Sequence, residues 1–308
     1  MTNRMGFLEK LGFGKGGKST AGSPRSTRKI DVDERFERIR TAVSGTMSKF
    51  YAARDRQTDK LVGLKLCELE KYTFFESRFK GMNKPSEGEI AASMDHPNIM
   101  KTLEYGMTNQ NEPYLVMEFI DGPGLNTLIQ NRDLERLGDK RLSLIVQMAD
   151  AIAYVHKKGY IHRDVCPRNF ICSSDIDLIK LIDFGLTVPA TEPFMRPGNR
   201  TGTPLYMAPE IVRRRATDHR LDIFAFGVSC YQLLTFEFPW PGGEVSGLAA
   251  LNHDTSNPRD IFEYRPDLNR TLGSLIMQSV QPNPQDRVPS MQQFVQTLGK
   301  VDREVARA

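Results

Sequence analysis

The chain has 308 residues, 39% hydrophobic and 26% charged, a balance typical of a soluble globular protein with one large or two-lobed unit. Its net charge of +4 is uneven, because residues 1–30 carry seven Lys or Arg against one acid, Glu9, and the remainder is close to −2. The body therefore lacks the basic surface of a nucleic-acid-binding protein, and we expect no nucleic-acid partner. No apolar run reaches the roughly 18 residues of a membrane span, so no transmembrane segment is predicted.

The cysteines indicate a reducing compartment. Neither metal-ligand spacing nor a disulfide framework is recognisable among Cys67, Cys166, Cys172 and Cys230. The N-terminus also lacks an apolar core of signal-peptide length. We therefore expect free thiols and a cytoplasmic location.

The N-terminal residues 1–34 are rich in Gly, Ser, Lys and Arg and are predicted to form a flexible basic tail. Residues 12–19 match a phosphate-binding loop, but that loop must follow a strand, and only eleven residues precede it. We interpret the match as part of a solvated tail. The alternative is weak contact with an anionic membrane, assisted by Phe7, Leu8, Leu11 and Phe13.

Beyond the tail, the pattern changes from strands to helices. Short strands are predicted at residues 36–43, 49–53, 61–66 and 114–119, with a turn at 55–59. Residues 72–95 have a helical composition interrupted by Gly81, Pro85 and Gly88. Apolar residues at helical spacing predict helices at 142–153 and about 221–234. The sequence thus predicts an α+β fold with a small strand-rich part followed by a larger helical part.

Three residues in the second half carry the chemical signal. Asp164 and Asn169 lie five residues apart, and Asp183 opens an Asp-Phe-Gly tripeptide nineteen residues after Asp164. Phosphoryl transfer needs a carboxylate to take a hydroxyl proton and further oxygen ligands to hold Mg²⁺ against the phosphates. Each short motif is weak alone, but this order and spacing together favour a phosphotransferase.

Over residues 35–302 the chain resembles eukaryotic-type (Hanks-type) Ser/Thr protein kinases. The motifs that carry the resemblance are those at residues 62–65, 96–98, 162–169, 183–185, 202–204 and 208–210. The resemblance implies a two-lobed protein-kinase fold, with the N-lobe at 35–119, the C-lobe at 120–302 and a short tail at 303–308. It also implies ATP and Mg²⁺ as cofactors, and protein substrates with Ser or Thr acceptors.

The resemblance assigns roles to individual residues. Asp164 would be the catalytic base, and Asn169 and Asp183 would hold Mg²⁺. Lys65 would contact the α- and β-phosphates and pair with Glu87. The nucleotide would further contact the backbone of the phosphate loop at Gly45 and of the hinge at Glu118 and Ile120. Asp222 and the pair Glu210–Arg287 match family positions near the end of the domain, where the resemblance implies a structural role in the large lobe.

Two departures from the family pattern affect the phosphates. The phosphate loop keeps only Gly45, since Val43 and Ser48 stand where two further glycines are usual, and nucleotide affinity is expected to fall. Cys166 replaces the lysine that Ser/Thr kinases usually carry two residues after the catalytic Asp. Arg168 matches a position where many tyrosine kinases carry arginine, and its guanidinium would supply the missing charge. We interpret Cys166 as inert, with a reactive thiol as the alternative.

A third departure concerns the helix that should carry Glu87. Pro85 and the capping-box pattern from Ser86 to Glu89 predict that the helix starts there, which puts Glu87 in the first turn. The pair with Lys65 would then form in only some states, and Glu89 is the alternative partner.

Several functional alternatives remain open at the level of sequence. A weakly active or inactive pseudokinase that serves as a binding scaffold is the main rival to an active Ser/Thr kinase. Arg168 keeps tyrosine or dual specificity open. Arg163 suggests control by phosphorylation of the activation segment, for which Thr201 and then Thr191 are the candidates.

Overall fold

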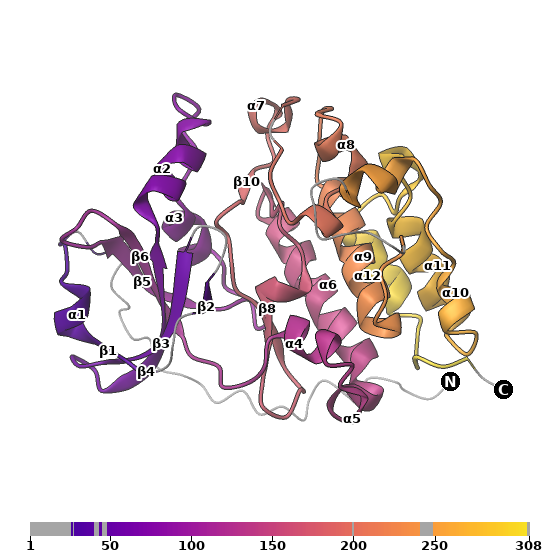
Figure 1. Cartoon of the computed structure of the whole chain (residues 1–308), viewed down its shortest axis with the longest axis horizontal. Coiled ribbons are helices and arrows are strands. Elements are labelled where there is room, and N and C mark those ends of the chain that lie inside the picture. Colours follow the sequence, from indigo (N-terminus) through magenta and orange to yellow (C-terminus); the bar gives the residue numbers. More distant parts are fainter. Residues whose placement is uncertain are drawn as a thin grey trace, which may run out of the picture.

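The computed structural model describes residues 26, 28–39, 43–44, 48–198, 200–240 and 249–306. These residues form a strand-rich N-lobe and a helical C-lobe, which lie side by side in Figure 1 and confirm the predicted two-lobed fold. The hypotheses about residues 1–25 and about Gly45 lie outside the described residues. The last part of the predicted flexible tail, up to residue 34, is instead folded onto the N-lobe, because Ile30 pairs with Thr108 and Val32–Arg35 forms a short helix with Val32 buried.

The N-lobe is built on an antiparallel sheet with the strand order β1-β3-β4-β6-β5, in which β2 also pairs with β3. Its elements are α1 (Val32–Arg35), β1 (Phe36–Arg38), β2 (Val43–Ser44), β3 (Ser48–Asp55), β4 (Lys60–Cys67), α2 (Leu69–Ser77), α3 (Glu87–Ala92), β5 (Thr102–Met107) and β6 (Pro113–Glu118). The sequence prediction identified β3, β4 and β6 but missed β5. In β5, Glu104 and Gly106 weaken the local strand signal, and pairing with β6 compensates for it.

The helical composition predicted for residues 72–95 corresponds to two helices rather than one. Between α2 and α3 the backbone takes positive φ at Gly81 (81°) and Asn83 (52°), which no helix can contain. The interruption expected from the glycine and proline pattern is therefore real. It leaves α3 as a short helix that begins next to the sheet.

Strand alternation decides which residues of β4 face the C-lobe. Val62 and Leu64 are buried in a small core with Phe36 and Tyr114 on the outer side of the sheet. Because successive side chains point to opposite faces, Lys65 faces the other side, toward the C-lobe. The position of this lysine thus follows from the hydrophobic pattern of its own strand.

The C-lobe is organised around helices α6 and α9. Its elements are α4 (Leu125–Gln130), α5 (Leu134–Leu137), η1 (Gly138–Lys140), α6 (Arg141–Lys157), β7 (Tyr160–Ile161), η2 (Pro167–Asn169), β8 (Phe170–Cys172), β9 (Ile179–Leu181), β10 (Val188–Pro189), α7 (Glu192–Met195), η3 (Pro204–Tyr206), α8 (Pro209–Val212), α9 (Arg220–Thr235), η4 (Ala249–Asp254), α10 (Ile261–Tyr264), α11 (Arg270–Ser279), η5 (Pro284–Asp286) and α12 (Met291–Leu298). Both long helices predicted from apolar spacing are present as α6 and α9. None of the helices in the described part of the chain has the length and apolar character needed to cross a bilayer.

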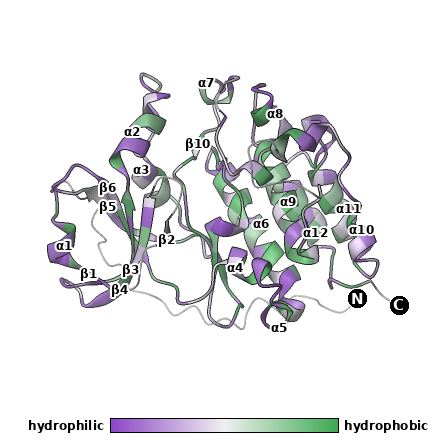
Figure 2. Ribbon diagram, viewed as in Figure 1, coloured by the Kyte–Doolittle hydropathy of each residue, from purple (hydrophilic) through white to green (hydrophobic). Residues whose placement is uncertain are grey.

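Helix α9 is the centre of the C-lobe. Every residue from Leu221 to Thr235 is buried, which is the pattern of a helix enclosed on all sides. Figure 2 shows hydrophobic colouring along α6 and α9 and more hydrophilic colouring on outer elements such as α10. Helix α9 is therefore a rigid support for the segments that pack against it.

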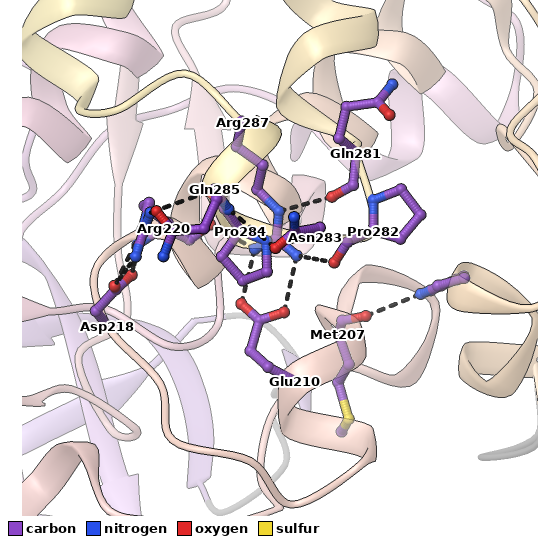
Figure 3. A network of polar contacts seen from close by, with 11 residues as sticks. Met207, Glu210, Asp218, Arg220, Gln281, Pro282, Asn283, Pro284, Gln285 and Arg287 are labelled. Carbon is purple, nitrogen blue, oxygen red and sulfur yellow. Dashed lines mark hydrogen bonds and ion pairs between the residues drawn. The ribbon is translucent and has the colours of Figure 1, made fainter.

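A buried ion pair braces the far side of the C-lobe, as the sequence interpretation proposed. Arg287 donates from Nη1 and Nη2 to the two carboxylate oxygens of Glu210, at 2.7 and 2.8 Å (Figure 3). The same guanidinium donates to the carbonyls of Gln281, Pro282 and Arg220. This pair ties the end of the activation segment to the loop before α12.

The segment after α12 is held on the C-lobe by a second buried cluster. Glu304 accepts from Arg141 Nη2 at 2.6 Å and from Arg265 Nη1 at 2.9 Å. The three side chains are 8–16% exposed. The backbone of this segment also pairs with the C-lobe through Leu268 and Val305. Glu304 therefore neutralises two arginines that would otherwise be buried together.

We predict that Glu304→Ala lowers the free energy of unfolding by about 3–5 kcal/mol, because it leaves the buried Arg141 guanidinium without a carboxylate and removes one of the two carboxylates that Arg265 contacts, the other being Asp267. Urea denaturation followed by circular dichroism measures the change. Glu192→Ala is the matched control, since Glu192 pairs with Arg196 on the exposed surface and its removal should leave the unfolding curve in place. Equal curves for Glu304→Ala and the wild type would contradict the prediction.

Candidate active site

A cavity of about 370 Å³ lies where the two lobes meet. Both lobes line it, and the sequence-predicted residues among its walls are Lys65, Glu87, Asp164, Arg168, Asn169 and Asp183. The fold thus brings together residues that are more than one hundred positions apart in the chain. Glu118 and Ile120, the predicted hinge contacts, are not among the described residues that line this cavity.

Lys65 is the centre of the charged network in the cavity. Its ammonium group contacts the carboxylate of Glu87 and lies 2.8 Å from Asp183 Oδ1. The side chains of Lys65 and Glu87 are 2% and 6% exposed. The Lys65–Glu87 pair, which the sequence analysis expected in only some states, is present here.

Burial and the neighbouring opposite charges act in opposite directions on the pKa values of Lys65, Asp183 and Glu87. Burial would lower the pKa of Lys65, but the carboxylates of Asp183 and Glu87 outweigh it and raise that pKa above its ordinary value. Burial alone would raise the pKa of Asp183, but the Lys65 ammonium holds it below its ordinary value. Burial does raise the pKa of Glu87, because one ammonium serves two carboxylates in a site with little water.

The start of α3 sets the position of Glu87. The side chain of Ser86 accepts from the backbone N–H of Glu89, and the Glu89 carboxylate accepts from the backbone N–H of Ser86. This capping box confirms that the helix begins at Glu87. Glu89, the alternative partner for Lys65, is thus used to cap the helix, and Glu87 reaches the lysine from the first turn.

Asp164 and Asn169 form one hydrogen-bonded unit in the catalytic loop. Asn169 Nδ2 donates to the backbone carbonyl of Asp164 at 2.7 Å and to its Oδ2 at 3.0 Å. The hairpin of β8 and β9 pairs Phe170 with Leu181, so the residues just before β8 and just after β9 are neighbours. This pairing places Asn169 beside the segment that carries Asp183.

Asp222, at the start of α9, holds the backbone of the same loop. Its carboxylate accepts from the N–H groups of His162 and Arg163 at 2.7 and 2.8 Å, and from His156 Nε2 at 2.8 Å. Arg163 has a φ of 69°, a left-handed conformation that is unfavourable for arginine. The two hydrogen bonds from Asp222 stabilise this strained backbone, which supports the structural role expected for Asp222.

Thr203 is a site residue that the sequence analysis missed. Its N–H and hydroxyl donate to Asp164 Oδ1 at 3.0 and 2.7 Å. Together with Asn169, it engages both carboxylate oxygens of Asp164 and fixes the orientation of that group. The sequence analysis used residues 202–204 only as one of the motifs that carry the family resemblance. No local sequence pattern predicts that Thr203 contacts a residue 39 positions away.

Arg168 and Cys166 approach the same threonine. Arg168 Nη2 donates to Thr203 Oγ1 at 2.8 Å, while the thiol of Cys166 lies 3.6 Å from that oxygen. The Thr203 proton is given to Asp164, so the thiol is the donor in its contact. Arg168 is exposed toward solvent, whereas Cys166 is fully buried. The guanidinium of Arg168 is therefore close to Asp164 and accessible to a bound phosphate.

The side chain of Glu118, a predicted hinge residue, contacts residues of both lobes. Its Oε1 accepts from the backbone N–H of Lys101 and from Lys180 Nζ at 2.8 and 2.5 Å. Its own backbone N–H donates to the carbonyl of Lys101 at 3.0 Å. The backbone N–H of Glu118 is thus already paired within the N-lobe.

The oxygen atoms of Asp183 and Asn169 could hold a divalent metal only if phosphate oxygens supplied further ligands. Among the residues that the structure describes, no group of three or more His, Cys, Asp or Glu could hold a metal ion by itself. Asn169 uses its amide nitrogen toward Asp164, which leaves its carbonyl oxygen as a ligand. One carboxylate and one amide oxygen match the incomplete protein coordination typical of Mg²⁺ bound to a nucleotide.

Comparison with known proteins identifies the family. The protein kinase domain model matches residues 36–298, and the chain belongs to this family. It is 30% identical over 273 residues to the serine/threonine-protein kinase pkn3 of Myxococcus xanthus, covering 85% of this chain and 49% of that protein. It is 31% identical over 269 residues to the Aurora kinase of Saccharomyces cerevisiae, covering 85% and 68%. It is 26% identical over 263 residues to PknB of Mycobacterium leprae, covering 83% and 41%.

The bacterial relatives are longer proteins, and the chain spans about half or less of the length of pkn3 and PknB. What is shared is the kinase domain. Membership of this family implies ATP, a divalent metal and protein substrates.

We predict that Cys166 does not react with alkylating reagents in the folded protein. Burial and the neighbouring Asp164 raise the pKa of this thiol to about 12, so it stays protonated and unreactive at pH 8. Mass spectrometry after iodoacetamide treatment should find Cys166 unmodified in native protein. All four cysteines are free and buried, so all four should be modified in urea. Modification of native Cys166 would instead support the reactive-thiol alternative.

Proposed function

We propose that this protein is an active kinase that transfers the γ-phosphate of ATP to Ser or Thr hydroxyls of protein substrates. The observation that carries the proposal is the buried contact of Lys65 with both Glu87 and Asp183 in the cavity that also contains Asp164. A scaffold has no need of this charge arrangement, since its desolvation is costly without a phosphate to bind.

Asp164 is the catalytic base in this proposal. Its carboxylate accepts the proton of the acceptor hydroxyl as the oxygen attacks the γ-phosphate. Thr203 and Asn169 hold the carboxylate in one orientation, so little reorganisation is needed when the acceptor arrives. Lys65, which the two carboxylates keep charged, orients the α- and β-phosphates.

Asp183 and Asn169 would hold Mg²⁺, with phosphate oxygens completing the coordination. When bound, the metal neutralises the charge of the phosphates. The lowered pKa of Asp183 keeps this carboxylate ionised for that task at neutral pH. Gly45 and the backbone of Glu118 and Ile120 are proposed to contact the nucleotide, as expected from the sequence.

Arg168 takes the place of the missing lysine in this proposal. It is a permanent cation close to Asp164, and its hydrogen bond to Thr203 Oγ1 holds the guanidinium near that carboxylate. The names of the similar proteins support Ser/Thr specificity, and so does the contact of Thr203 with Asp164.

We predict that wild-type protein incorporates label from γ-labelled ATP and Mg²⁺ into itself or into casein, and that Asp164→Asn reduces this rate by at least about 10³-fold. The amide keeps the size of the side chain but accepts no proton from the acceptor. Asp177→Asn is the matched control, because Asp177 is an exposed carboxylate paired with Lys140 and should not matter.

The labelled amino acids decide the specificity in the same experiment. Label on Ser or Thr supports the proposal, and label on Tyr would replace it with tyrosine or dual specificity. Absence of label with wild type at high enzyme concentration would favour the scaffold alternative.

We further predict that Arg168→Ala lowers kcat by about 10²-fold, because the transferring phosphate loses the guanidinium close to Asp164. Introducing lysine at position 166 in that background, as Cys166→Lys with Arg168→Ala, should restore much of the loss. Arg136→Ala removes an arginine that binds the Ser174 carbonyl elsewhere and serves as the control. If Cys166→Lys did not restore activity in a folded Arg168→Ala protein, the result would argue against a shared role of the two positions.

A further inference from the structure

Gly88, the residue directly after Glu87, is buried against Tyr105 of β5. A Cβ added at Gly88 would lie 2.4 Å from Cδ2, 2.6 Å from Cγ and 2.9 Å from Cβ of Tyr105. These distances are far below van der Waals contact. Because the Cβ of Tyr105 is fixed to its backbone, rotation of the ring cannot relieve the overlap. Only glycine lets α3 lie this close to β5.

Strand β5 has little freedom to move away from α3. One edge of β5 pairs with β6. At its other edge, the N–H of Ser26 donates to the carbonyl of Tyr105 at 2.8 Å and the N–H of Ile30 donates to Met107 at 3.2 Å. The strand is thus hydrogen-bonded on both sides, so a larger residue at position 88 would displace the short helix rather than the sheet.

We propose that Gly88 and Tyr105 are positioning residues, which set the spacing between α3 and β5 and thereby hold Glu87 on Lys65. The proposal rests on the proposed kinase function, since it concerns the ion pair of that site. Helix α3 has only six residues, and Glu87 is its first. Any shift of the helix is therefore passed directly to the carboxylate.

The size of the displacement can be judged from the overlap. Restoring ordinary contact requires α3 to move by roughly 1 Å, and a misplacement of that size can cost about 10²-fold in rate. Alanine also has a higher helix propensity than glycine, so Gly88→Ala would favour the helix itself. If Gly88→Ala is folded but less active, the loss therefore indicates a changed spacing between α3 and β5 and not an unfolded helix.

The first experiment compares Gly88→Ala with wild type in the full chain. We expect a 10–100-fold lower kcat. Gly299→Ala is the matched control, because Gly299 has a helical φ of −61° and an added Cβ there meets its neighbours at 3.5 and 3.6 Å, which is ordinary contact. It should have wild-type kcat.

Coupling to Glu87 separates positioning from general damage. In a Glu87→Gln background, Gly88→Ala should cost less than threefold, because the pair it acts through is already weakened. An equal cost of Gly88→Ala in both backgrounds would overturn the proposal.

A second readout does not depend on phosphate transfer. Buried and paired, Lys65 should acetylate slowly with acetic anhydride, and Gly88→Ala should raise the rate at Lys65 at least fivefold, as measured by mass spectrometry. Unchanged labelling and unchanged kcat in folded Gly88→Ala would refute the positioning role. An inactive wild type would refute the kinase function while the labelling still tests the positioning.

The Tyr105 series covers the case in which Gly88→Ala does not fold. Tyr105→Phe keeps every atom that meets Gly88 and should keep kcat within twofold of wild type. Tyr105→Ala removes the ring against which α3 rests, and it should lower kcat and raise Lys65 labelling. Wild-type values for Tyr105→Ala would contradict the proposal.

Discussion

The buried ammonium of Lys65 is the interaction on which the rest of the site depends. It contacts both Glu87 of the N-lobe and Asp183 of the C-lobe, so it joins the two halves of the cavity. Three charged groups that are largely buried are unfavourable unless their geometry is maintained. The capping box of α3 and the hydrogen bonds of the catalytic loop both serve that geometry.

The second organising feature is the arrangement around Asp164. Thr203 and Asn169 engage its two carboxylate oxygens, and Arg168 approaches through Thr203. The thiol that replaces the usual lysine stays buried and neutral, so the positive charge next to the base comes from two residues further along. The segment around Asp164 tolerates a cysteine in place of the usual lysine, because Asp222 binds the backbone of this segment independently of the side chain at position 166.

Much of the fold and of the site was predictable from local pattern. Strands β3, β4 and β6 follow from short β-rich runs bounded by turns, helices α6 and α9 follow from helical spacing, and the start of α3 follows from Pro85 and the capping box. β5 was missed because its stability comes from its neighbour β6. Thr203 was missed because its partner Asp164 lies 39 residues away and no local pattern encodes that contact.

The sequence by itself determined which chemical groups are available and in what order, since residue type and spacing identify Lys65, Asp164, Asn169 and Asp183. It could not determine whether Glu87 reaches Lys65 from the first turn of its helix. Only the tertiary structure decided that point, because the answer depends on how closely α3 packs against β5. That distance is set by contacts such as Gly88 with Tyr105, which exist only once the chain has folded.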